Sequence, residues 1–202
     1  MEIKTIGILG AGTMGSQIAQ VAAQAGFNIV LRDIEDRIVD NAMKSIEMFQ
    51  SRSVEKGKIT EEEKSAIMSR IKPATRIGAV NDVDFIIEAI VEDIDVKKKL
   101  FAELDELTRL EVILATNTSS LSLTELATSV KRQDKIVGMH FFNPAQIMRL
   151  VEVIRGLNTS DETVATAMGL VRSFKKEPIQ VRIDSPGFVV NRMMIASNIE
   201  AI

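Results

Sequence analysis

Apolar residues along the chain fall into short runs that alternate with longer stretches of helical spacing. Residues 5–10 (TIGILG) form a short β-branched run, and residues 11–25 then place Met14, Ile18 and Val21 on one side of a helix. Residues 28–33 form a second run after a glycine that is a typical helix end. These segments predict a strand, a tight turn, a helix and a second strand, and therefore a parallel βαβ unit.

The alternation continues over most of the remaining chain. We expect further strands at 85–90, 112–115, 136–141, 150–154 and 179–181, and helices at 96–107, 123–129 and 161–174. This order of elements predicts an α/β fold with a doubly wound, mostly parallel sheet.

Two segments depart from the regular alternation. Residues 34–70 are polar and amphipathic, and Gly57 with the cap-like start at Thr60 predicts two helices that project beyond the sheet. After a turn at 184–188, residues 189–202 form an apolar helix whose face has no partner in the sequence. We infer either a truncated chain or a helix that packs against another subunit.

Composition excludes several classes of protein. The 202 residues carry a formal net charge of −3, which argues against a generally basic, nucleic-acid-binding surface. The absence of cysteine excludes a disulfide framework and thiolate catalysis, and a single histidine excludes a multi-histidine metal site, so no metal is expected. The sequence shows neither a secretory signal nor an apolar run that could span a bilayer, which predicts a cytoplasmic protein.

The motif G-x-G-x-x-G occupies residues 10–15, between the first strand and the first helix. In this context its glycines permit the tight turn, the close approach of a pyrophosphate and close helix packing, as in the Rossmann fold. We therefore assign the loop to a dinucleotide site; the residues are Gly10, Gly12, Thr13, Met14 and Gly15. A glycine-rich turn without a ligand is the alternative.

Asp33 closes the second strand, about twenty residues after the glycines, where a carboxylate accepts hydrogen bonds from the ribose hydroxyls and repels a 2′-phosphate. This position favours NAD over NADP. Arg32 and Arg37 lie close enough in sequence to soften the repulsion, although solvated surface arginines are the commoner explanation.

The only histidine, His140, ends an apolar strand, at the edge where open α/β sheets bind their ligands. Glu152 interrupts the next apolar strand, and a carboxylate in such a segment is costly to bury without a partner. We expect the two side chains to pair, with the imidazole as a base and the carboxylate fixing its tautomer. A structural histidine on an apolar strand is the alternative.

Residues 117–120 (NTSS) follow another buried strand and present short hydrogen-bonding side chains at the same edge of the sheet. They can bind a ligand, cap the following helix, or do both, since a cap uses only one hydroxyl. The sequence leaves these alternatives open.

Five segments together resemble the 3-hydroxyacyl-CoA dehydrogenase family, including the bacterial 3-hydroxybutyryl-CoA dehydrogenases. They are residues 10–15, 117–120 (NTSS), 140–144 (HFFNP), 150–154 (LVEVI) and 185–192 (SPGFVVNR), and the resemblance covers essentially the whole chain. It implies an NAD-binding domain at 1–184, followed at 185–202 by a linker and the first helix of a truncated all-α domain. Family members continue for roughly a further helical domain that supplies much of a homodimer contact.

The resemblance also implies roles for particular residues. His140 is expected to be the catalytic base and Glu152 its orienting partner, while Ser119 and Asn191 are expected to hydrogen-bond the substrate. The resemblance further implies contacts for the cofactor and for coenzyme A. The cofactor is expected to meet Glu92, Lys97, Asn117 and Asn143, of which Asn143 also helps to position the histidine or the substrate. Lys56, in the helical excursion, is expected to meet the phosphates of coenzyme A.

The expected reaction is the reversible, NAD-dependent oxidation of a (3S)-3-hydroxyacyl-CoA, such as 3-hydroxybutyryl-CoA, to a 3-oxoacyl-CoA. One alternative is a related β-hydroxyacid or sugar-acid dehydrogenase, which needs no phosphate-binding lysine at Lys56. Another is a non-catalytic NAD-binding relative. The expected partners are an acyl-CoA substrate and, in the full-length protein, a second copy in a homodimer; nucleic acid and a membrane are not expected.

Overall fold

The computed structural model describes residues 2–200, without the side chains of Asn198 and Glu200. The strands are β1 (Thr5–Leu9), β2 (Asn28–Arg32), β3 (Ile71–Ala74), β4 (Phe85–Glu88), β5 (Ile113–Thr116), β6 (Ile136–Phe141), β7 (Leu150–Ile154) and β8 (Glu177–Val181). The α-helices are α1 (Thr13–Gln24), α2 (Asp36–Glu55), α3 (Glu61–Ser69), α4 (Ile94–Leu107), α5 (Leu123–Ala127), α6 (Asp161–Ser173) and α7 (Val190–Glu200). Two 3₁₀ turns, η1 (Ile77–Val80) and η2 (Gln133–Lys135), complete the described elements.

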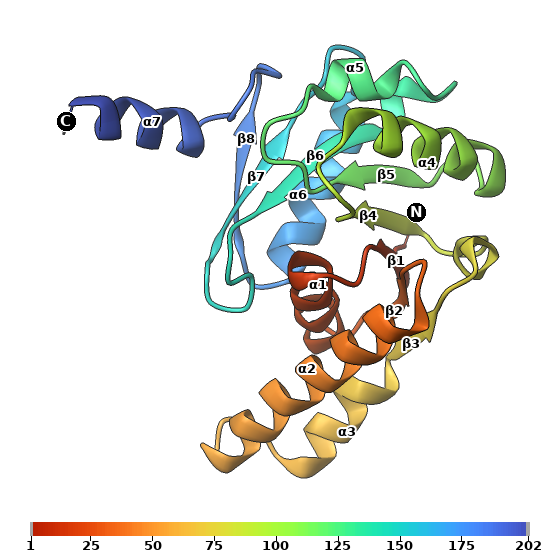
Figure 1. Cartoon of the computed structure of the whole chain (residues 1–202), viewed down its shortest axis with the longest axis vertical. Helices are drawn as coiled ribbons and strands as arrows, with labels where there is room; N and C mark the ends of the chain where they lie inside the picture. Colours follow the sequence, from red (N-terminus) through yellow and green to blue (C-terminus); the bar gives the residue numbers. More distant parts are fainter. Residues whose placement is uncertain (1, 201–202) are drawn as a thin grey trace.

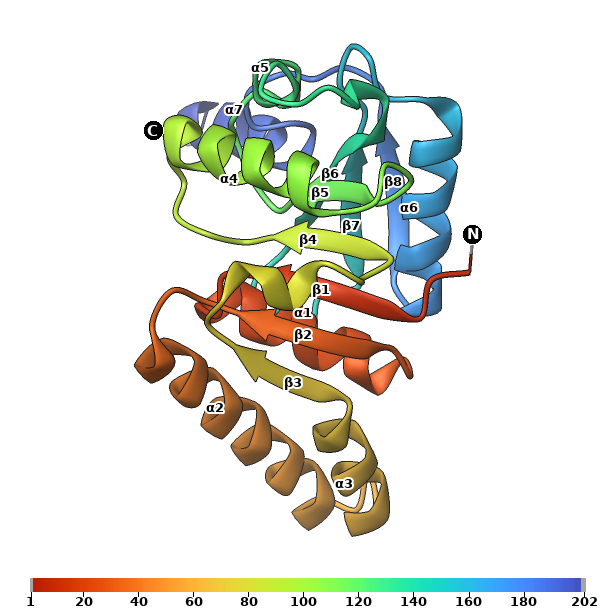
Figure 2. The same cartoon turned by 90° about the vertical axis from the view of Figure 1, so that its right-hand side faces the viewer.

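The strands form one sheet in the order β3-β2-β1-β4-β5-β6-β7-β8 (Figures 1 and 2). The first six strands in this order are parallel, and β7 pairs antiparallel with β6. The expected α/β, doubly wound Rossmann sheet is therefore confirmed. The strand order reverses between β1 and β4, and such a switch point opens a crevice at the carboxyl ends of the strands.

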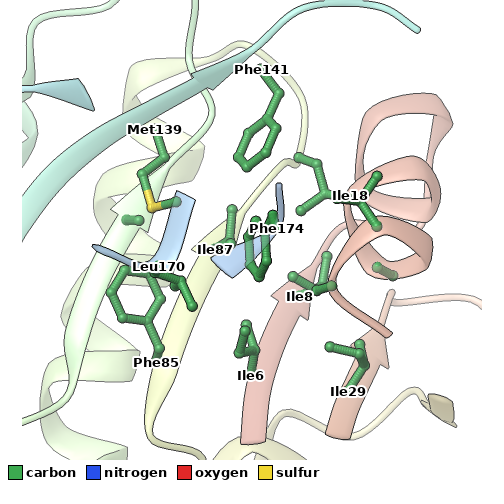
Figure 3. Close-up of a cluster of buried hydrophobic side chains, with 14 of the residues drawn as sticks. Ile6, Ile8, Ile18, Ile29, Phe85, Ile87, Met139, Phe141, Leu170 and Phe174 are labelled. Carbon is green, nitrogen blue, oxygen red and sulfur yellow. The ribbon is translucent and has the colours of Figure 1, made fainter. Parts of the chain in front are cut away.

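Side chains alternate across each strand, so the sheet has two apolar faces. Ile6 and Ile8 of β1 and Ile87 of β4 contribute to the core on the α1 and α6 side, where Figure 3 shows them with Ile18 of α1. Leu9 and Ile86 point the other way, into the core beneath α4 and α5. Helices on both faces of a parallel sheet explain why its central strands are almost wholly apolar.

The helices α2 and α3 project away from the sheet, as the polar pattern of residues 34–70 predicts (Figures 1 and 2). They join at the glycine at position 57, which has a positive φ of 64°. The next helix begins with a capping box: Thr60 Oγ1 accepts from Glu63 N at 3.1 Å, and Glu63 Oε2 accepts from Thr60 N at 2.8 Å. These reciprocal bonds satisfy two backbone donors at the start of α3.

Strand β3 was not expected from the sequence. Its four residues, IKPA, are short and partly polar, and Pro73 has no N–H to donate to a ladder. The strand forms because β3 is an edge strand that pairs with β2 only, so the missing donor is harmless there. The other expected strands and helices are confirmed with small shifts of their ends; residues 201 and 202 of the expected terminal helix lie outside the described residues.

Helix α7 leaves the sheet, and Figure 1 shows it extending to one side of the molecule. Its exposed apolar side chains are Met193, Met194, Ile195 and Ile199. No helix in the part of the chain from residue 2 to residue 200 is long and apolar enough to cross a membrane.

The core makes a simple prediction about stability. Ile87→Ala removes a side chain with no exposed surface, and we expect it to lower the free energy of unfolding by about 2–5 kcal/mol. Ile183→Ala, at a position that is 72% exposed, should change it by less than about 0.5 kcal/mol. Urea unfolding followed by circular dichroism measures both; equal effects would contradict the assignment of Ile87 to the core.

Candidate functional site

The glycine loop brings the start of α1 unusually close to β1. Gly10 has a φ of +96°, and a Cβ there would lie 2.4 Å from the carbonyl oxygen of Ala89. A Cβ at Gly15 would lie 1.7 Å from the carbonyl oxygen of Gly10, so that position admits no side chain. At Gly12, by contrast, a Cβ would meet nothing within 4 Å. Protein backbone therefore fills the space beside Gly10 and Gly15, whereas the space beside Gly12 is open. This open space fits a dinucleotide whose pyrophosphate approaches the backbone.

A cavity of about 510 Å³ lies on one side of this loop, and Gly10, Gly12 and Asp33 line it. Asp33 Oδ2 accepts from Ala11 N, and Oδ1 accepts from Ile34 N, both at 2.7 Å. The carboxylate thus ties the glycine loop to the end of β2 and also lines the cavity. Arg32 Nε donates to the carbonyl of Thr75, so this guanidinium has a partner within the protein.

A second cavity, of about 460 Å³, lies at the carboxyl ends of β4, β5 and β6. The predicted site residues that line it are Thr13, Met14, Glu92, Lys97, Asn117, Ser119, His140 and Asn143. Ala89 and Ile90, at the end of β4, line both cavities. The two cavities therefore meet at the switch point, where a dinucleotide spans the two halves of the sheet.

His140 and Glu152 occupy directly opposite positions on the antiparallel strands β6 and β7. Cross-strand partners point to the same face of a sheet, which explains why residues twelve apart in sequence meet. His140 Nδ1 lies 2.7 Å from Glu152 Oε2, and the glutamate has no exposed surface. The carboxylate accepts Nδ1–H, which leaves Nε2 of the neutral imidazole free to accept a proton.

The other oxygen of Glu152 reaches the start of α7. Oε1 accepts from the backbone N–H groups of Val189 and Val190, each at 3.0 Å. Burial raises the pKa of Glu152, but the hydrogen bonds from His140, Val190 and Val189 outweigh burial, so the pKa lies below its usual value. Glu152 is therefore ionised at neutral pH.

The rings of two phenylalanines pack against the imidazole of His140. The ring centroid of His140 lies 4.5 Å from that of Phe142 and 5.8 Å from that of Phe188. Phe188 is buried and has a positive φ of 49°, a conformation that is uncommon for a bulky residue. The sequence predicted a turn at 184–188, but Phe188 was not identified as a site residue, because the apolar pattern does not show that its side chain points toward His140.

A polar network lies beneath the second cavity. Lys97 Nζ is 2.5 Å from Glu88 Oε1 and 3.4 Å from Glu92 Oε2. Glu92 Oε1 accepts from Thr118 Oγ1 and, at 3.0 Å, from Ser119 N. Burial raises the pKa of Glu92, but these two hydrogen bonds and the charge of Lys97 outweigh burial, so the pKa lies below its usual value.

The two predicted asparagines have defined partners. Asn117 Oδ1 accepts from Phe141 N at 2.9 Å and so holds the end of β6. Asn143 Oδ1 accepts from Gln17 Nε2 at 3.2 Å, and Gln17 Oε1 accepts from Ala145 N at 2.6 Å. Gln17 therefore fixes the loop after His140 to α1, a role that no sequence motif indicated.

Lys56 and Asn191 do not join the other predicted residues. Lys56 is exposed at the carboxyl end of α2, and it lines neither of the two cavities. Asn191 lies on α7 and lines a separate open cavity of about 400 Å³ with Ser120. Within residues 2–200, no group of three or more His, Asp or Glu side chains is arranged to hold a metal ion.

Comparison with known proteins gives concordant matches. Residues 5–184 match the family model described as 3-hydroxyacyl-CoA dehydrogenase, NAD binding domain. The chain is 45% identical over 197 residues to the 3-hydroxybutyryl-CoA dehydrogenase of Clostridioides difficile, a match that covers 98% of this chain and 70% of that protein. A relative from Bacillus subtilis, described as a probable 3-hydroxybutyryl-CoA dehydrogenase, is 43% identical over 202 residues, which are all of this chain and 70% of the relative.

Among solved structures, the (S)-3-hydroxybutyryl-CoA dehydrogenase of Ralstonia eutropha superposes with a TM-score of 0.96 at 44% identity. The match covers 99% of this chain and 70% of the other. The sequence resemblance is therefore confirmed, and the glycine loop and both cavities lie within the matched residues 5–184.

The glycine loop makes a prediction that separates binding from folding. Gly12→Ala points its methyl group into open space, so we expect an unchanged melting temperature but NADH binding weakened about tenfold or more, because the methyl group meets the cofactor. Gly15→Ala collides with the Gly10 carbonyl and should lower the melting temperature as well. Circular dichroism melts and NADH fluorescence titrations measure the two effects; undiminished NADH affinity in Gly12→Ala would contradict the site.

The lowered pKa of Glu152 predicts a contribution to acid stability. Because the carboxyl binds its proton less readily in the folded chain, its stabilising effect is full above the unfolded pKa of about 4.3 and is lost as the pH falls through the folded pKa. We expect the free energy of unfolding of Glu152→Gln to fall less steeply than wild type below about pH 4.3. Glu106→Gln, at an exposed position of α4, is the matched control and should retain the wild-type slope. A wild-type slope in Glu152→Gln would refute the effect.

Proposed function

We propose that this chain, which belongs to the 3-hydroxyacyl-CoA dehydrogenase family of NAD-binding domains, carries the cofactor site and acid–base pair for reversible oxidation of (3S)-3-hydroxyacyl-CoA to 3-oxoacyl-CoA. The observation that carries the proposal is the His140–Glu152 pair, at 2.7 Å, whose imidazole lines a cavity that shares residues with the glycine-loop cavity. Similarity to named 3-hydroxybutyryl-CoA dehydrogenases over nearly the whole chain supports the acyl-CoA substrate.

The pair has the features of a general base. In the oxidative direction, Nε2 of neutral His140 accepts the proton of the substrate's 3-hydroxyl group. Glu152 keeps Nδ1 protonated, and its charge stabilises the imidazolium that forms. When bound, NAD supplies the hydride acceptor for the same carbon. In the reverse direction, the imidazolium returns its proton to the 3-oxygen.

Ser119 and Asn191 are the proposed hydrogen-bond donors to the substrate. Ser119 lines the cavity beside His140, and Glu92 holds its backbone N–H in place. Asn191 lies in the first turn of α7, whose amino end is tied to Glu152. Each proposed donor is thus held near a carboxylate that accepts backbone hydrogen bonds, Ser119 by Glu92 and the start of α7 by Glu152.

Cofactor contacts follow from the lining of the two cavities. We propose that Asp33 binds the adenosine ribose, that the glycine loop binds the pyrophosphate, and that Glu92 and Lys97 meet the nicotinamide ribose. Asn117 and Asn143 flank the same cavity. For coenzyme A, the exposed Lys56 on the projecting α2–α3 pair is the proposed phosphate contact.

The domain division is part of the same proposal. We place the boundary of the NAD-binding domain at residue 184, where the family match ends. Residues 185–202 then begin a second, helical unit, which the departure of α7 from the sheet supports (Figure 1).

The test is oxidation of NADH by acetoacetyl-CoA, followed at 340 nm. We expect turnover by the wild-type chain, and a loss of about 10²–10⁴-fold in kcat for His140→Gln with NADH affinity retained, because the imidazole transfers the proton. Glu106→Gln is the control and should behave as wild type.

Other outcomes distinguish the alternatives. Equal turnover of acetoacetate and acetoacetyl-CoA, without inhibition by free coenzyme A, would favour a β-hydroxyacid dehydrogenase and remove the role of Lys56. NADH binding without any turnover would refute the proposed reaction for this chain and leave a cofactor-binding domain.

A further inference from the structure

Glu88 is a fully buried carboxylate that the proposed reaction does not use. It ends β4, and in register it lies between Leu9 of β1 and Thr116 of β5, at the point where the strand order reverses. Its side chain has no exposed surface. A carboxylate in this position costs free energy unless its oxygens are fully hydrogen-bonded, so its presence requires an explanation.

Three donors surround the Glu88 carboxylate. Oε1 accepts from Lys97 Nζ at 2.5 Å and from Ile90 N at 2.7 Å, and Oε2 accepts from Thr116 Oγ1 at 2.6 Å. Burial nevertheless raises the pKa of Glu88 above its usual value, against the opposing effects of Lys97, Thr116 and Ile90. The contacts hold the carboxylate, yet apolar residues at this place would avoid the cost of burying it.

The contacts of Glu88 lead directly to the cofactor cavity. Lys97 is only 1% exposed, and it lines that cavity and bridges Glu88 to Glu92. Glu92 in turn accepts from Ser119 N. Ile90, which donates to Glu88, lines both halves of the cofactor site. The Glu88 carboxylate therefore fixes both the Lys97 ammonium group and the backbone N–H of Ile90, the residue that lines both cavities.

We propose that Glu88 is a positioning residue of the cofactor site, which acts by holding the Lys97 ammonium against Glu92 and thereby fixing Ser119. The inference rests on the proposed contact of Lys97 and Glu92 with the cofactor. Glu88 itself touches neither cofactor nor substrate, since it does not line either cavity.

Glu88→Gln tests this role with little change in shape. The amide oxygen can still accept from Lys97 and Ile90, and the amide nitrogen can donate to Thr116 Oγ1, whose hydroxyl has lone pairs to spare. The negative charge is lost, and with it the acceptor of the Thr116 hydroxyl hydrogen. Lys97 then retains Glu92, at 3.4 Å, as its carboxylate partner among the described residues.

The measurement is the NADH dissociation constant by fluorescence titration, which a chain without tryptophan or tyrosine allows with little background. We expect Glu88→Gln to weaken NADH binding about tenfold, and Glu106→Gln, an exposed charge loss on α4, to leave it within about twofold of wild type. Because Glu88 acts through Lys97, Glu88→Gln should add less than about twofold in a Lys97→Met background.

Stability distinguishes positioning from a merely structural role. The double variant removes both buried charges, so its melting temperature should recover relative to Glu88→Gln, whereas its NADH affinity should not. If Glu88→Gln does not fold, Thr116→Val removes one hydrogen bond to the carboxylate without changing charge, and should weaken NADH binding about two- to threefold.

Three results would overturn the proposal. The first is unchanged NADH affinity in Glu88→Gln or in its substitute Thr116→Val. The second is that Glu88→Gln reduces NADH affinity equally in the wild-type and the Lys97→Met backgrounds. The third is absence of NADH binding by the wild-type chain. Because the assay measures NADH binding alone, a wild-type chain that binds NADH but does not turn over acetoacetyl-CoA would refute the proposed reaction and leave this inference to be decided by the titrations.

Discussion

The carboxylate of Glu152 lies in the sheet with no exposed surface, and the surroundings of the site are arranged to keep it charged. One oxygen accepts from His140, and the other accepts from two backbone amides at the start of α7. An unsatisfied charge there would cost several kcal/mol, on the order of the whole stability of a domain. Because this charge must be hydrogen-bonded, Glu152 holds β7 beside β6, selects the imidazole tautomer that carries a proton on Nδ1, and holds the backbone at the start of α7.

A second buried carboxylate, Glu88, has a comparable position at the centre of the sheet. Glu88 ends β4 at the edge where parallel strands bring their carboxyl ends together and where the order reversal between β1 and β4 opens a crevice, whereas Glu152 lies within β7, antiparallel to β6. The glycine loop closes one side of the opening, since Gly15 lies too near the Gly10 carbonyl to carry a side chain. Apolar side chains pack on both faces of the sheet, and Figure 3 shows those on the α1 and α6 side.

Most of this arrangement could be predicted from the sequence, and the reasons are local. Apolar runs marked the central strands, and the glycine spacing marked the cofactor loop between β1 and α1. The pairing of His140 with Glu152 was predictable because a carboxylate within an apolar strand requires a partner, and the structure confirms the contact. The catalytic role of that pair stays a prediction.

What the sequence did not reveal depends on contacts between distant segments. Strand β3 contains Pro73, and only its place at the edge of the sheet makes it a strand. Glu88 carried the same signal as Glu152, a carboxylate at an apolar strand, but its partners Lys97 and Thr116 come from α4 and β5 and have no motif. Phe188 reaches the imidazole through a left-handed backbone turn, which side-chain pattern alone does not encode.

The shared carboxylate of Glu152 also connects His140 mechanically to the start of α7. A tilt or shift of α7 moves the amides of Val189 and Val190, and because both oxygens belong to one rigid group, it also turns the oxygen that His140 contacts. The orientation of the imidazole is therefore tied to the position of a helix whose outer face is apolar and exposed. A contact made on that outer face is coupled, through the single side chain of Glu152, to the position of the His140 ring.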